Sequence, residues 1–153
     1  MRIYVDADAC PVKDEIYRVA NRYQLEVTVV SNSSFYVPAD SLVRMVIVKE
    51  GIDAADDWIV EQLSENDVVI TADIPLASRS LQKGAHVLGF TGNPFTPDNI
   101  GDAVATRELL AGLCERGEVR GGPPPFDKRD RSRFLQGLDR MIQAIRQDSA
   151  NDI

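Results

Sequence analysis

A short apolar run that ends in two aspartates, close to the N-terminus, constrains the fold more than any other part of the chain. Residues 3–5 (Ile-Tyr-Val) are β-formers, and this continuous apolar run predicts a strand covered on both faces. Asp6 and Asp8 follow where the run stops, and Pro11 suits the first turn of a helix. Open α/β sheets place their ligands at the carboxyl ends of their strands. Because the two carboxylates are close enough to repel, a hard cation between them would be stabilising.

Beyond this run, apolar strands and amphipathic helices alternate along the chain. The further strands are predicted at residues 26–30, 43–48, 67–70 and 85–90, and the helices at about residues 12–23, 53–63, 75–83, 99–114 and 131–146. This alternation predicts an α/β protein with a three-layer α/β/α, Rossmann-like fold and a mainly parallel sheet of about five strands. If strands one to three extend to one side and the others to the opposite side, strands one and four flank the switch point.

The connecting segments indicate one domain. A chain of 153 residues suits a single hydrophobic core. The Gly/Pro-rich spacer at residues 117–125 is too short to separate domains, so residues 1–153 are expected to form one domain that includes the last helix. Gly84 is expected to end the helix before it in a left-handed conformation. Residues 91–97 have the composition of an irregular loop.

Composition narrows the class of protein. The net charge of −7 argues against a broad phosphate-binding surface, although metal ions in an acidic pocket would supply positive charge to a nucleic-acid enzyme. Basic residues gather only near the C-terminus, at Lys128, Arg129, Arg131, Arg133 and Arg140. No run resembles a signal peptide or a membrane span. Two distant cysteines without a CxxC motif favour a reducing cytoplasm.

The aspartates at the strand ends have two interpretations. Acids near a helix N-terminus are favoured by about 0.3–1 kcal/mol, so Asp6 and Asp8 could simply cap the next helix. One acid would suffice for capping, and a pair therefore favours a metal site. Asp73 follows the fourth predicted strand and precedes Pro75, so capping is again the plainer interpretation. Its expected position beside Asp6 favours a ligand.

A further acid is expected on the helix that begins at Asp53. Asp53 and Asp56 have the spacing of a capping box. Asp56 also lies on the apolar stripe that should face the sheet, whereas Asp57 falls on the outer face. Because a buried acid without a partner is costly, Asp56 is expected to be a ligand and Asp57 solvated surface. Asp53 fits either role.

The donor types indicate which metal would bind. Carboxylates without a neighbouring histidine select Mg²⁺ or Mn²⁺ rather than zinc. The single histidine, His86, falls inside the fifth predicted strand and is expected to pack in the core. Cys10 is expected to be a small buried residue, because the neighbouring aspartates oppose a reactive thiolate.

Three segments together resemble a known family. Residues 5–13 (Val-Asp-Ala-Asp-Ala-Cys-Pro-Val-Lys), 51–56 and 71–77 resemble the YaiI/YqxD family of bacterial proteins. Downstream agreement is found at Asn99, Ile100, Arg107, residues 122–126, Asp130, Arg131 and Phe134. This family is similar in pattern to the PIN-like nucleases, which have a small α/β/α fold and an acidic Mg²⁺/Mn²⁺ pocket. The resemblance implies that Asp6, Asp56 and Asp73 are the principal acids and that Asp8 and Asp53 support them.

The leading functional hypothesis is a metal-dependent phosphodiesterase acting on RNA. Asp6, Asp56 and Asp73 would hold one or two metal ions, which activate water and stabilise charge on phosphorus. Substrate contacts are expected from polar residues near the strand ends and from basic residues. These are Asn32, Ser33, Thr71, Arg107, Lys128, Arg129 and Arg131. A solvated helix start is the plainer interpretation of each single basic residue near position 130.

Two other functions are compatible with the sequence. Asp-x-Asp after a first strand is also the nucleophile and acid of haloacid-dehalogenase-like phosphatases, with Asp6 attacking phosphorus. That function leaves the inward-facing Asp56 unexplained, and Cys10 stands where that group usually has Thr or Val. A non-catalytic interaction module with the same fold would agree with the acidic net charge.

Overall fold

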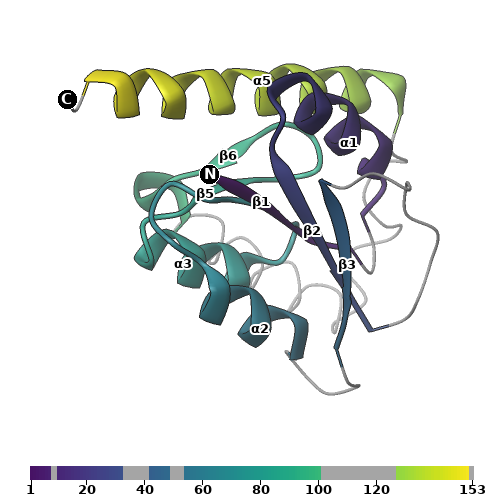
Figure 1. The fold of residues 1–153 in the computed structure, drawn as a ribbon, viewed down its shortest axis with the longest axis vertical. Coiled ribbons are helices and arrows are strands. Elements are labelled where there is room, and N and C mark those ends of the chain that lie inside the picture. Colours follow the sequence, from purple (N-terminus) through teal and green to yellow (C-terminus); the bar gives the residue numbers. More distant parts are fainter. Residues whose placement is uncertain (8–9, 33–41, 49–53, 101–126, 152–153) are drawn as a thin grey trace, which may run out of the picture.

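The computed structural model describes residues 1–7, 10–32, 42–48, 54–100 and 127–151 (Figure 1). In chain order the elements are β1 (Arg2–Asp6), α1 (Lys13–Tyr23), β2 (Glu26–Ser31), β3 (Val43–Ile47), α2 (Ala54–Gln62), β4 (Val68–Ile70), α3 (Ile74–Gln82), β5 (His86–Leu88), β6 (Pro94–Phe95) and α5 (Lys128–Asn151). Helix and strand alternate as predicted. The predicted helix at 99–114 begins at residue 97, and its residues beyond 100 lie outside the described part, as does the spacer at 117–125.

The described strands form one sheet in the order β3-β2-β1-β4-β5-β6. The first five strands along the chain pair in parallel, and β1 lies between β2 and β4. The predicted layout is therefore confirmed, with β1 and β4 at the switch point. One prediction was wrong: residues 91–97 are not wholly irregular, because the two-residue strand β6 pairs antiparallel with β5. So short a strand leaves no periodicity to detect.

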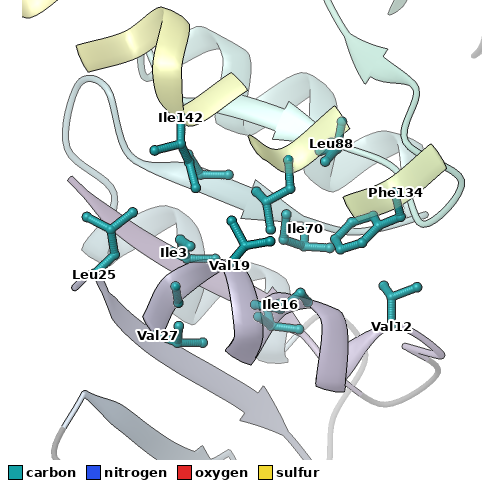
Figure 2. Close-up of a cluster of buried hydrophobic side chains, with 14 of the residues drawn as sticks. Ile3, Val12, Ile16, Val19, Leu25, Val27, Ile70, Leu88, Phe134 and Ile142 are labelled. Carbon is teal, nitrogen blue, oxygen red and sulfur yellow. The ribbon is translucent and has the colours of Figure 1, made fainter. Parts of the chain in front are cut away.

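Helices cover both faces of the sheet, which confirms the three-layer architecture (Figure 1). Side chains alternate along β1, so Ile3 and Val5 join a core cluster with α1 and α5, whereas Tyr4 joins a second cluster with α2 and α3. Figure 2 shows the first cluster, where Phe134 and Ile142 of α5 lie over the same strands as α1. Both faces of β1 are thus buried, as its unbroken apolar run predicts.

Helix α5 begins three residues earlier than predicted. Asp127 and Asp130 cap its first turn reciprocally: Asp130 N donates to Asp127 Oδ1 at 3.0 Å, and Asp127 N donates to Asp130 Oδ2 at 3.1 Å. This is the hydrogen-bond pattern of a capping box with an aspartate at each end. Lys128 and Arg129 therefore belong to the helix rather than to a preceding loop.

Two smaller expectations have opposite outcomes. Gly84 has φ +82° directly after the C-cap of α3, so the predicted left-handed ending is confirmed. His86 lies in β5 as predicted, but it is not a packed core residue. Its ring is only half-buried, and Nε2 lies 3.4 Å from Asn66 Oδ1. Position 86 is the first residue of a three-residue strand, and a strand end leaves the core.

Gly92 offers a test of how the β5–β6 connection is held against α5. Its φ is +87°, and a Cβ at this position would lie 2.3 Å from the carbonyl oxygen of Arg133. Gly92→Ala should therefore lower the free energy of unfolding by at least about 2 kcal/mol, through backbone strain and this contact. Gly89→Ala is the matched control, because its Cβ would meet no atom closer than 3.4 Å. Urea unfolding would measure both variants, and equal losses would contradict this account.

Candidate functional site

A buried hydroxyl links the ends of the two central strands. Thr71 directly follows β4 and is 0% exposed, and Asp6 is the last residue of the neighbouring strand β1. Thr71 Oγ1 donates a hydrogen bond to Asp6 Oδ2 at 3.0 Å. The parallel pairing of Val5 with Ile70 brings the two residues together. The switch point therefore has a carboxylate whose position is held by the adjacent strand.

The same hydroxyl reaches the next acid along the chain. Thr71 Oγ1 accepts a hydrogen bond from the backbone N–H of Asp73 at 3.0 Å. Asp73 is the N-cap of α3, where its Oδ1 accepts from Leu76 N at 3.0 Å. The capping interpretation of Asp73 is thus correct. Among the described residues, that is the one hydrogen bond of its carboxylate, and Oδ1 alone makes it. The cap fixes Asp73 close to Asp6 without using Oδ2.

The acids of α2 face opposite ways, as predicted. Asp56 is only 8% exposed, in the first turn of the helix. The side chain of Asp57 is 59% exposed and pairs with Arg79 at 2.8 Å. Asp6 lies two residues after Tyr4, so it points to the same side of β1, the side that α2 and α3 cover. Asp56 and Asp6 therefore belong to one layer of the molecule.

These acids do not form a ready-made metal cage. Within the part of the chain that the structure describes, no three His, Cys, Asp or Glu side chains lie close enough together to hold a metal ion. Asp8 and Asp53, the predicted supporting acids, lie outside the described residues. The described geometry joins two acids, Asp6 and Asp73, through Thr71.

Six of the seven predicted substrate residues fall into three groups, and the seventh, Arg131, contacts the start of α1. Asn32 follows β2 and is exposed, and Lys128 and Arg129 are exposed at the start of α5. Thr71 is fully buried and holds Asp6, so the structure gives it a positioning role instead of a substrate contact. Ser33 and Arg107 lie outside the described residues.

Arg131 joins α5 to the start of α1. Its Nη1 donates to the carbonyl oxygen of Pro11 at 2.8 Å and to Glu15 Oε1 at 3.2 Å. Glu15 is buried, and nothing in the local sequence distinguishes it from the exposed Asp14 beside it. Only the partner, 116 residues away, explains why this acid is inside.

Cys10 is a buried thiol, as predicted. It is 7% exposed, and burial raises its pKa to about 11 against the lowering effects of a backbone hydrogen bond at Val12 and of the charge of Lys13, while Asp6 and Glu15 make smaller upward contributions. A thiol with this pKa is neutral at physiological pH and is a poor nucleophile. Cys10 is therefore a buried packing residue and not a candidate nucleophile.

Comparison with known proteins agrees with the resemblance seen in the sequence. The family described as "Uncharacterized BCR, YaiI/YqxD family" matches residues 4–144. The chain belongs to the YaiI/YqxD family. A relationship of this family to PIN-like nucleases stays a prediction, and no solved structure gives a significant match to the chain.

Relatives in other bacteria are similar over nearly their whole length. The "UPF0178 protein" of Parvibaculum lavamentivorans is 56% identical over 144 residues, which are 94% of this chain and 95% of the relative. The "UPF0178 protein mlr0875" of Mesorhizobium japonicum is 57% identical over 141 residues, 92% of this chain and 91% of the relative. These names state no activity. Among the described residues, no helix is both long and apolar enough to cross a membrane.

The Thr71 bridge predicts a hydroxyl-specific effect on stability. Thr71→Val keeps the shape of the side chain but removes the hydrogen bonds to Asp6 and to the backbone of Asp73. We expect the free energy of unfolding to fall by about 1–3 kcal/mol, because buried polar groups lose their partner. Thr71→Ser keeps the hydroxyl and should lose clearly less. Equal losses for the two variants, measured by chemical denaturation, would assign the effect to packing instead.

The buried thiol predicts slow alkylation. At pH 9 an exposed cysteine with the ordinary pKa of 9.0 is half ionised, whereas a thiol of pKa about 11 is only about 1% ionised. Iodoacetamide should therefore label Cys10 at least about fifty-fold more slowly in the native protein than in urea. Peptide mass spectrometry separates Cys10 from Cys114. Similar rates in both states would show that Cys10 is accessible and ionised.

Proposed function

We propose that this protein is a Mg²⁺- or Mn²⁺-dependent phosphodiesterase that cleaves RNA in the bacterial cytoplasm. The observation that carries the proposal is the Asp6–Thr71–Asp73 bridge. It holds two acids at the carboxyl ends of the adjacent strands β1 and β4, where the strand order reverses. Open α/β sheets bind their ligands at this place.

The donor set suits a hard cation. Mg²⁺ is usually bound by one or two carboxylates together with water and substrate phosphate, and does not need an all-protein cage. Asp6, whose carboxylate accepts from the Thr71 hydroxyl, and Asp73, whose backbone N–H donates to that hydroxyl, would supply the two carboxylates of this pattern. Asp56, from the same layer, would be the third acid, and Asp8 and Asp53 would support the site. Carboxylate donors without histidine favour Mg²⁺ or Mn²⁺ over zinc.

Each residue has a distinct task in this proposal. A bound ion would polarise the phosphodiester and make an attacking water more acidic. Asp6 and Asp73 would hold that ion. Thr71 would keep the Asp6 carboxylate in one orientation through the hydrogen bond from its hydroxyl. Asn32, exposed after β2, would donate to a phosphate or ribose oxygen beside the acids.

Mn²⁺ titration by calorimetry tests the metal first. Wild type should bind Mn²⁺, and Asp6→Asn/Asp73→Asn should lose this binding, because amides are weaker ligands for a hard cation. Asparagine still caps a helix and still accepts a hydrogen bond, so the fold should be kept. Asp57→Asn is the control, since Asp57 is an exposed acid on the outer side of α2. Loss of binding in the control, or no binding by wild type, would refute the metal site.

Cleavage of labelled RNA tests the reaction itself. Asp6→Asn should slow Mn²⁺-dependent cleavage by about 100-fold or more, because metal stabilisation of the transition state is worth several kcal/mol. Asp57→Asn should cleave at the wild-type rate. Undiminished cleavage by Asp6→Asn would refute the role of this carboxylate. Turnover of a phosphomonoester with phosphate trapped on Asp6 would instead identify a phosphatase.

A further inference from the structure

The net charge of −7 conceals a separation of charge between the layers. Helices α1 and α5, which cover one face of the sheet, carry nine Lys and Arg against five Asp and Glu. The rest of the chain carries eight basic and 19 acidic residues. The α1/α5 layer is therefore at +4 and the remainder at −11. A surface of one sign on a protein of the other sign attracts a partner to that surface alone.

A groove between these two helices gathers part of the positive charge. We call it the α1–α5 groove: a cavity of about 400 Å³ lined by Arg18, Val19, Asn21, Arg22, Leu135, Gln136 and Asp139. Arg18 and Arg22 are both exposed, and they are one turn apart, about 6 Å along the helix. The groove therefore presents two guanidinium groups side by side at its rim.

The one acid in the α1–α5 groove is already engaged within the protein. Asp139 accepts hydrogen bonds from Tyr23 Oη, from Gln143 Nε2 at 3.2 Å and from Arg22 at 3.5 Å. The Arg22 pair is exposed and therefore weak. Arg18 has no carboxylate within salt-bridge distance among the described residues. The cations of the groove thus remain available to an anion.

Helices α1 and α5 run side by side in the same direction (Figure 1). Arg131 contacts Glu15 near the start of α1, and Arg146 lies over the Tyr23 ring at its end. The starting end of the helix pair lies at Pro11, a few residues after Asp6. The α1–α5 groove lies further along the pair, beside residues 18–22 of α1, and is therefore a surface separate from the candidate site.

We propose that the α1–α5 groove binds the phosphate backbone of a single RNA strand, with Arg18 and Arg22 contacting successive phosphates. The choice of RNA rests on the function proposed above. Arg18 and Arg22 lie on one face of α1, about 6 Å apart along the helix, so they can contact neighbouring phosphates of one strand. Asn21 and Gln136 both donate and accept hydrogen bonds, as ribose and base edges require. An acidic peptide could pair with the same two guanidinium groups, so it is the competing ligand that the experiment below separates from RNA.

Anisotropy of a fluorescein-labelled 12-nucleotide RNA, in EDTA, tests the groove separately from the metal. Arg18→Gln/Arg22→Gln should weaken binding roughly 25-fold at about 0.1 M salt, since each lost phosphate contact removes a slope of about 0.7 in log K against log salt. The slope itself should fall by about 1.4. Glutamine is a good helix former, so α1 should be kept.

The matched control is Arg44→Gln/Lys83→Gln, which removes two exposed charges outside α1 and α5. It should bind RNA within about two-fold of wild type. Equal weakening of both double variants would show that overall charge, and not the groove, holds RNA. Unchanged binding in Arg18→Gln/Arg22→Gln would also overturn the inference. Tighter binding of a polyglutamate peptide than of RNA would overturn it in favour of an acidic protein.

The two proposals fail in different ways. Asp6→Asn/Asp73→Asn should keep its RNA affinity in EDTA, because the groove needs no metal. RNA binding that depends on Arg18 and Arg22, together with no Mn²⁺ binding by wild type, would support the groove and refute the metal site. Mn²⁺-dependent cleavage, together with an RNA affinity that is unchanged in Arg18→Gln/Arg22→Gln, would refute the groove but not the metal site.

Discussion

Strand β1 is covered by a helix layer on each face, and the rest of the sheet is arranged around that burial. Its side chains must be apolar on both sides until the strand leaves the core, which happens at Asp6. The first polar side chain after the apolar run is therefore at the carboxyl end of the strand. Thr71 holds it there from the neighbouring strand. The hydrogen bond from the buried Thr71 hydroxyl therefore fixes the position of the Asp6 carboxylate at the end of β1.

Local patterns predicted most of the elements, and contacts between distant segments account for what they missed. Runs rich in apolar and β-branched residues located β1 to β5, and the stripe of α2 placed Asp56 inside and Asp57 outside. Strand β6 has two residues and no pattern. The burial of Glu15 depends on Arg131, which is far away in the sequence. Thr71 was expected to contact substrate because the sequence does not show whether a hydroxyl near an acid faces solvent or the core.

The sheet divides the molecule into layers that differ in net charge. The candidate acids lie on the α2/α3 side of the sheet, whereas the excess of basic residues lies on the α1/α5 side. A phosphate chain arriving along one layer would turn over the carboxyl edge to reach the acids of the other. The net charge of the protein therefore does not predict which ligands its separate surfaces attract.

Helix α5 also affects the order in which the two faces of the sheet can be covered as the chain folds during synthesis. It supplies Phe134, Leu138, Ile142 and Ile145 to the core cluster that α1 begins, although residues 24–127 separate the two helices in the chain. During synthesis, α1 and the open face of β1 remain uncovered until α5 has emerged. The α2/α3 layer needs no such delay. One face of the sheet is therefore covered early, whereas the other stays exposed to chaperones and proteases until α5 has been made.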